Sequence, residues 1–188
     1  MKRVIIVHGW EGYPEYCWYP AVKKELEDKG FQVEIPLMPE TKLPKMNKWV
    51  AKLAEVVSRS NQDTYLIGHS LGTVTILRYL EELKENQSVG GVILVAGFTD
   101  SLGYEELANF FTTPLNLEKI KTKASHFVAI HSDNDPFVDL KYGEEFKSKL
   151  GTKLIIKHQM GHFSGEVDDE TSCTDLPDVT QEILEISK

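Results

Sequence analysis

The chain has 188 residues, of which 41% are hydrophobic and 27% are charged, and its formal net charge is −8. This length predicts one domain over residues 1–188, and the composition is that of an ordinary globular protein, which excludes disordered and fibrous classes. The acidic excess argues against a nucleic-acid partner, because a phosphate backbone attracts basic surfaces.

Short apolar runs alternate with helical periodicity along the chain. Strands are predicted at residues 4–7, 32–35, 64–67, 91–95, 127–130 and 153–157. Helices are predicted at residues 20–29, 45–58, 71–84, 104–111, 141–150 and 177–186. Near-continuous apolar strands suit a sheet that is covered on both faces, and the alternation indicates βαβ units. The sequence therefore predicts an α/β fold with a parallel sheet.

Membrane, secreted and metal-binding classes find no support in the sequence. The longest apolar run, residues 92–96, is far shorter than the roughly 20 residues of a membrane-spanning helix. No signal-peptide pattern is present at the start of the chain, so we expect a cytoplasmic protein without a membrane partner. Cys17 and Cys173 show neither metal-ligand spacing nor a disulfide framework. They are interpreted as free thiols, and no metal or cofactor is predicted.

Ser70 stands in a G-x-S-x-G pentapeptide, Gly68 to Gly72, directly after the third predicted strand and before a predicted helix. This context is typical of a nucleophile elbow, a strained turn in which the residues two positions before and after the serine nearly touch. Glycines fill both of those positions. Because ligands of open α/β sheets bind beyond the carboxyl ends of the strands, Ser70 is the predicted nucleophile.

A serine hydroxyl needs a base to take its proton, and six histidines are available. Five of them border strands or precede the serine, positions at which an imidazole commonly bonds the backbone: His8, His69, His126, His131 and His158. His162 differs, because it lies in a Gly-His-Phe turn beyond the last predicted strand. A mobile loop there could swing the imidazole over the sheet edge to Ser70, so His162 is the predicted base.

The base needs an anion that fixes its tautomer, and two aspartates follow the fifth predicted strand. Asp135 is favoured over Asp133, because Pro136 gives Asp135 a rigid turn, whereas Asp133 suits a turn-capping role. Attack on a carbonyl also needs two N–H donors for the oxyanion. We expect these from Leu71, which directly follows the serine, and from Trp10 in the loop after the first strand.

Taken together, these segments resemble the α/β-hydrolase superfamily, and within it the small serine hydrolases related to a retinoblastoma-binding protein. The resemblance rests on residues 7–12, 18–20, 66–72, 132–138 and 161–163, with Pro36, Pro39, Pro44 and Trp49. It implies a three-layer α/β/α fold around a roughly six-stranded parallel sheet, and a Ser-Asp-His hydrolase. Ala21 departs from the pattern, which has a second tryptophan there, and this affects the pocket beside the oxyanion loop.

The favoured function is a serine hydrolase that cleaves carboxylic esters of small molecules through an acyl-enzyme. Thioester or small-amide cleavage would use the same groups, and the alternative is a protein-binding module built on a hydrolase fold. Residues 96–125 are too few for a large cap domain, so a shallow site for small or exposed acyl groups is expected. Phe110 and Phe111 either line the acyl pocket or form the buried face of a short helix.

An acidic stretch, Glu166 to Asp175, follows His162, and no lysine or arginine occurs between His158 and Ser187. It is interpreted as a solvated loop, because the alternative of a divalent-cation site lacks the spacing of an EF-hand. Its negative potential is expected to disfavour anionic substrates and to raise the pKa of the base.

Overall fold

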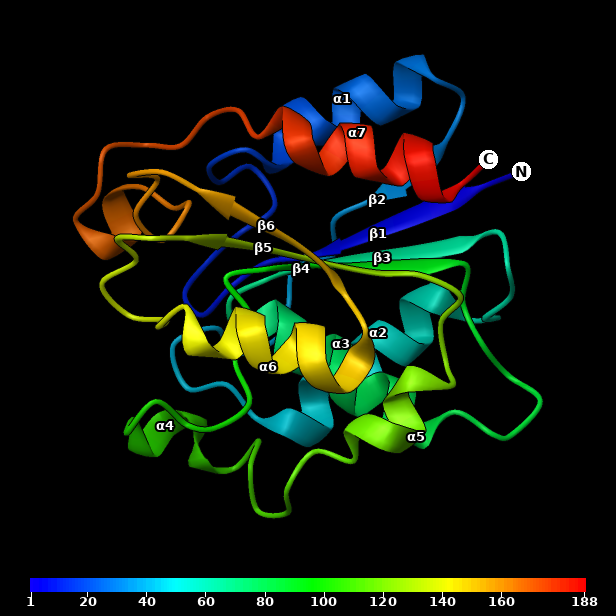
Figure 1. Ribbon diagram of the computed structural model, residues 1–188, viewed down its shortest axis with the longest axis horizontal. Helices are drawn as coiled ribbons and strands as arrows, with labels where there is room; N and C mark the ends of the chain where they lie inside the picture. The colour runs from blue at the N-terminus through cyan, green and yellow to red at the C-terminus, as the bar shows by residue number, and fades with distance from the viewer.

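A computed structural model describes residues 1–188 as one parallel sheet with helices on both faces (Figure 1). The strands are β1 (Arg3–Val7), β2 (Gln32–Glu34), β3 (Thr64–His69), β4 (Gly91–Val95), β5 (Phe127–Ser132) and β6 (Lys153–Lys157). The helices are α1 (Tyr19–Asp28), α2 (Met46–Val57), α3 (Leu71–Glu82), α4 (Glu105–Ala108), α5 (Leu117–Lys121), α6 (Lys141–Leu150), the short 3₁₀ turn η1 (Glu166–Asp168) and α7 (Pro177–Ile186). None of these helices has both the length and the apolar character needed to cross a membrane.

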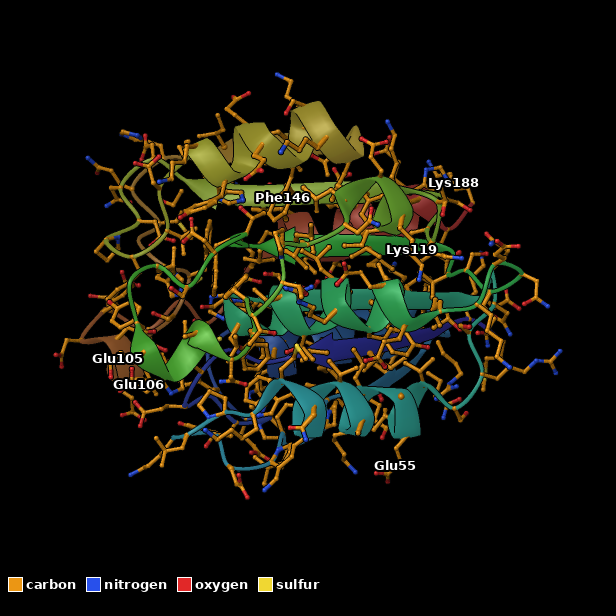
Figure 2. The ribbon with its side chains drawn as sticks, turned by 90° about the horizontal axis from the view of Figure 1, so that it is seen from below. Glu55, Glu105, Glu106, Lys119, Phe146 and Lys188 are labelled. Atoms are coloured by element: carbon orange, nitrogen blue, oxygen red, sulfur yellow. The ribbon has the colours of Figure 1, made fainter.

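The sheet divides the apolar core into two layers. Along β1, Val4 and Ile6 face the core beneath α1 and α7, whereas Ile5 and Val7 face the core beneath α2 and α3. Figure 1 shows α1 and α7 together on one face, and Figure 2 shows α2, α3 and α6 side by side across the other. Strands covered on both faces must be apolar on both, which is why the runs in the sequence are continuous. The predicted three-layer α/β/α fold is confirmed.

The strand order β2-β1-β3-β4-β5-β6 creates a switch point beside β1. The chain leaves β1 towards β2 on one side, and β3 and the later strands add to the other side. Loops therefore diverge at the carboxyl end of β1 and β3 and leave a crevice between them, where ligands of such sheets bind. The loop after β1 and the turn after β3 border this crevice.

The segment between β4 and β5 differs from its prediction. The helix expected over residues 104–111 ends at Ala108, and the amides of Phe110 and Phe111 instead bond carbonyls three residues back. Arg78 of α3 donates from Nε to the carbonyl of Phe110 at 2.9 Å, which ties this stretch to α3. A further short helix, α5, follows and was not predicted, although the side chain of Asn116 caps its first turn.

Candidate active site

Ser70 occupies the sharp turn between β3 and α3. Its backbone lies at φ 51° and ψ −121°, outside the regions that side-chain-bearing residues ordinarily adopt. A Cβ at Gly68 would lie 2.6 Å from the amide nitrogen of Thr73, and one at Gly72 would lie 2.1 Å from the carbonyl oxygen of Val7. Side chains at these two positions would force the turn apart, so the spacing of the two glycines is what lets the serine stand at the strand end.

Ser70, His162 and Asp135 lie in one line of hydrogen bonds. Nε2 of His162 is 2.9 Å from Oγ of Ser70, and its Nδ1 is 2.8 Å from Oδ2 of Asp135. The other carboxylate oxygen of Asp135 accepts the amides of Phe137 and Val138 at 2.9 and 3.0 Å. The turn after Pro136 therefore fixes the carboxylate, which fixes the imidazole in turn. The Asp135 side chain is 1% exposed, so water does not compete for it.

The surroundings of His162 favour its protonated form. Burial alone would lower the pKa of the imidazole, but the hydrogen bond and negative charge of Asp135 outweigh it, and Asp168 and Glu170 add to the effect. The net result is a pKa above the ordinary histidine value. The acidic stretch contributes to the rise through Asp168 and Glu170, as expected, but Asp135 is its main cause. Such a group is well suited to accept a proton near neutral pH.

Asp133 has different partners from Asp135. Its carboxylate contacts Nδ1 of His158 at 2.5 Å and accepts the amide of Gln159 at 2.8 Å. The hydrogen bond from Gln159 and that from His158 lower the pKa of Asp133, which keeps it ionised. The structure thus brings Asp135, and not Asp133, to the imidazole of His162. Asp133 bonds the loop after β6 and does not cap a turn of its own loop, a role that Asp135 takes instead.

His69 is buried immediately beneath the line of three groups. Its Nδ1 lies 2.7 Å from the hydroxyl of Tyr19, and its Nε2 lies 2.7 Å from the carbonyl oxygen of His162. Burial, together with the neighbouring His162, lowers the pKa of His69 to about 3, so the ring stays neutral. A neutral ring donates through one nitrogen only, so Nε2 donates to His162 and Nδ1 accepts from Tyr19. His69 therefore supports the backbone of the loop that carries His162.

Trp10 and Leu71, the two residues expected to supply oxyanion donors, both line the cavity at Ser70. The amides of Trp10 and Leu71 donate no hydrogen bond to a loop, cap or side-chain acceptor of the protein. Leu71 is the first residue of α3, where the helix leaves its N–H groups unpaired. Gly9 brings the first loop close, since a Cβ there would lie 3.2 Å from Cβ of Ser70.

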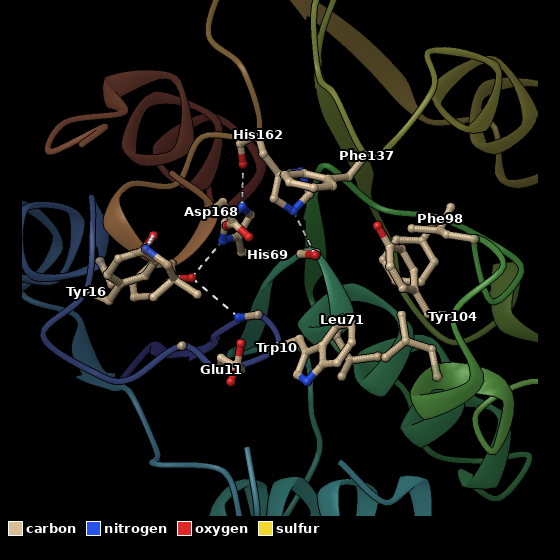
Figure 3. Close-up of a pocket in the computed structure, with 17 residues that line it drawn as sticks. Trp10, Glu11, Tyr16, His69, Leu71, Phe98, Tyr104, Phe137, His162 and Asp168 are labelled. Carbon is tan, nitrogen blue, oxygen red and sulfur yellow. Dashed lines mark hydrogen bonds between the residues drawn. The ribbon is translucent and has the colours of Figure 1, made fainter. Parts of the chain in front are cut away.

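A cavity of about 140 Å³ opens at Ser70. Half of its ten hydrophobic lining residues come from the segment after β4 and from the turn after Pro136: Phe98, Leu102, Tyr104, Leu107 and Phe137. In Figure 3, Phe98 and Tyr104 lie on one side of the cavity and Tyr16 and Asp168 on the other, with His162 above. Glu11 also lines it, and no lysine or arginine does.

The interpretation of Phe110 and Phe111 as pocket residues was wrong. Phe110 is fully buried against Trp49, and Phe111 packs behind Phe98, so neither reaches the cavity. The alternative, a buried face of a short helix, does not describe them either, because both residues follow the end of α4 at Ala108. Phe98 was missed, although a signal existed: it lies three residues after the end of β4, on the same edge of the sheet as Ser70.

The chain is similar to known proteins over most of its length. The model of the serine hydrolase family matches residues 4–172. The chain is 34% identical to the protein YdeN of Bacillus subtilis over 94% of this chain and 91% of YdeN. It is 32% identical to the serine hydrolase RBBP9 of Rattus norvegicus over 86% of this chain and 87% of RBBP9.

The fold is also shared with a solved relative. The crystal structure of the ydeN gene product from B. subtilis superposes with a TM-score of 0.91 and 32% identity, and the match covers 99% of this chain and 98% of that one. The family model spans most of the chain, and both relatives exceed 30% identity over most of their length. The chain belongs to the serine hydrolase family.

Proposed function

We propose that this protein cleaves carboxylic esters through an acyl-enzyme, with Ser70 as nucleophile, His162 as general base and Asp135 as the anion that orients the base. The observation that carries the proposal is the line of hydrogen bonds from Ser70 to His162 and on to Asp135, at 2.9 and 2.8 Å. A serine hydroxyl next to a neutral imidazole can lose its proton as it attacks, which a free hydroxyl near pH 7 cannot do.

The first half of the reaction forms the acyl-enzyme. As Oγ of Ser70 attacks the carbonyl carbon, its proton passes to Nε2 of His162, and the carbonyl oxygen becomes an oxyanion. The free amides of Trp10 and Leu71 then donate to that oxygen. Asp135 stabilises the imidazolium through Nδ1–H. The imidazolium returns the proton to the departing alkoxide, which leaves as an alcohol.

The second half releases the acid. A water molecule gives a proton to Nε2 of His162 and attacks the acyl carbon, and a second oxyanion forms at the same amides. Collapse of this intermediate breaks the bond to Oγ, and Ser70 takes the proton back from the imidazolium. The carboxylic acid then ionises and leaves a cavity that Glu11 and Asp168 line. Two acidic side chains beside the product favour its departure.

The cavity supports esters with a small apolar acyl group. A volume of about 140 Å³ with apolar side chains on one wall suits a short acyl chain. Thioesters and small amides use the same steps. A polyanionic thioester is disfavoured, because the lining includes Glu11 and Asp168 and no lysine or arginine to bind phosphate.

A fluorophosphonate probe tests the nucleophile. The wild-type protein and Ser148→Ala, which removes an exposed hydroxyl on α6, should both react, and Ser70→Ala should not. A series of p-nitrophenyl esters of increasing chain length should show turnover that falls once the acyl group exceeds the cavity. Labelling of Ser70→Ala would contradict the proposal. A folded wild type that neither reacts nor hydrolyses any ester would favour the protein-binding alternative.

A further inference from the structure

The loop that carries His162 is held by side chains along its whole length. The amides of Gln159, Met160 and Gly161 donate to side chains at the end of β5 and in the loop after it, at 2.8, 2.9 and 2.8 Å, and the acceptors are Asp133, Ser132 and Asn134. The loop is therefore tied to the sheet edge on one side, rather than free to swing as the sequence suggested. These contacts stop at Gly161, one residue before the imidazole.

Glu170 binds the backbone of His162 from the other side. Both of its carboxylate oxygens accept the amide of His162, at 2.9 and 3.0 Å, and one also accepts the hydroxyl of Ser164 at 3.0 Å. The carboxylate forms no ion pair with a lysine, arginine or histidine. An ionised acceptor gives shorter and stronger bonds to N–H groups than a neutral one does. Glu170 is thus held by uncharged donors of the loop alone.

The backbone of the loop is shaped to receive this carboxylate. Gly161 lies at φ 54°, in the left-handed region, and a Cβ there would sit 2.3 Å from Oε1 of Glu170. Any larger residue would push the carboxylate out of its place under the amide of His162. Glycine at position 161 therefore suits both its left-handed backbone and the space that Glu170 fills.

From this geometry we propose that Glu170 is a positioning residue for the reaction, which holds the imidazole of His162 against Ser70 and supplies part of the negative charge around it. The inference rests on the proposed function, in which His162 is the base. It also assigns a role to one member of the acidic stretch, Glu166 to Asp175. Glu170 touches no reacting atom and acts only through His162.

Three variants separate position from charge. Glu170→Ala removes both the acceptor and the charge, and Glu170→Gln keeps an acceptor but removes the charge. Asp169→Asn removes a neighbouring charge from an exposed residue whose side chain bonds nothing, and asparagine tolerates its left-handed backbone at φ 54°. Turnover of p-nitrophenyl acetate is measured for each across the pH range, together with the melting temperature.

Glu170→Ala should lower kcat by about 10- to 100-fold with little change in KM, the loss expected when a catalytic group is slightly misplaced. Glu170→Gln should keep more of kcat than Glu170→Ala does. In both variants the acid limb of the kcat/KM profile should move to lower pH, because a charge that raises the pKa of His162 is gone. Asp169→Asn should match the wild type in both measurements.

An activity-independent readout completes the test. Titration of the His162 ring by NMR should give a lower pKa in Glu170→Gln than in the wild type or Asp169→Asn. Glu170 variants with wild-type kcat and an unmoved His162 pKa would overturn the positioning role, as would a fall in melting temperature and activity without any shift of that pKa. Failure of the proposed function would look different: the wild type itself would be inactive, and the NMR titration would still respond to Glu170.

Discussion

His131 is a buried imidazole that the proposed reaction does not use. It lies in β5 beneath α6, is 1% exposed, and neither of its ring nitrogens has a hydrogen-bond partner. The ring of Phe146 is 6.3 Å away, and a Cβ on Gly143 would come within 3.0 Å of its Cδ2. Burial lowers the pKa of His131 to about 4; the negative charge of Asp135 opposes this effect and His162 adds to it.

This pKa makes the stability of the fold depend on pH. Since the folded-state pKa lies below the ordinary value of 6.5, folding favours the neutral ring, and protons bind more readily to the unfolded chain. The contribution of the neutral His131 ring to the free energy of unfolding is fully present above pH 6.5 and is lost as the pH falls from there towards 4. Between about pH 7.5 and about pH 5, His131 alone should remove about 2 kcal/mol from the free energy of unfolding.

Urea denaturation of the wild type and of His131→Leu at these two pH values checks the magnitude. Leucine has a similar volume and no charge, so the variant should lose about 2 kcal/mol less than the wild type on acidification. His8 and His69, whose pKa values are also lowered by burial, contribute equally to both proteins. At the higher pH the variant should be at least as stable, because no hydrogen bond is lost. Equal acid sensitivity of the two proteins would refute the reasoning.

Two further predictions concern the turn and the cavity. Gly72→Ala should destabilise the protein by at least about 3 kcal/mol, because its Cβ would lie 2.1 Å from the carbonyl oxygen of Val7. Gly30→Ala, whose Cβ meets nothing within 4 Å, should cost only about 1–2 kcal/mol for its positive φ. Equal thermal unfolding of the two variants would argue against the close contact at Gly72. A carboxylate-bearing phenyl ester should have a lower kcat/KM than its neutral analogue at low salt, and the difference should shrink as salt screens the charges of Glu11 and Asp168. Comparable kcat/KM values of the two esters at low salt would count against an acidic cavity.

The parts of the site that were predictable are those with local signals. Ser70 was identifiable because its two glycines, the strand before it and the helix after it are contiguous in the chain. His162 and Asp135 follow the last two strands, and the parallel sheet brings all such positions to one edge. Sequence alone therefore indicated which groups meet, whereas the distances between them depend on how the loops fold.

The parts that were missed depend on contacts between distant segments. Nothing near Phe110 in the sequence reveals that Arg78, on another helix, would hold its carbonyl and leave its ring against Trp49. Glu170 was one of several acidic residues in a stretch with no periodicity, and only its contact with the amide of His162 distinguishes it from its neighbours. Contacts between residues so far apart in the chain leave no pattern in a single sequence from which they could be predicted.

The contacts of Asp133 and Asp135 depend both on a local sequence signal and on a contact between distant segments. Both aspartates follow β5, two residues apart, and each contacts a histidine of the loop after β6. Asp133 pairs with His158 and Asp135 with His162, in both cases from the aspartate Oδ2 to the histidine Nδ1. The residue between them, Asn134, accepts the amide of Gly161. The two loops therefore pair in a fixed register, in which the position of each aspartate decides its partner. The residues next to Asp135 place it in a rigid turn, but the register of the loop after β6 decides which histidine contacts that turn. This register explains why Asp135 meets the imidazole beside Ser70 and Asp133 does not.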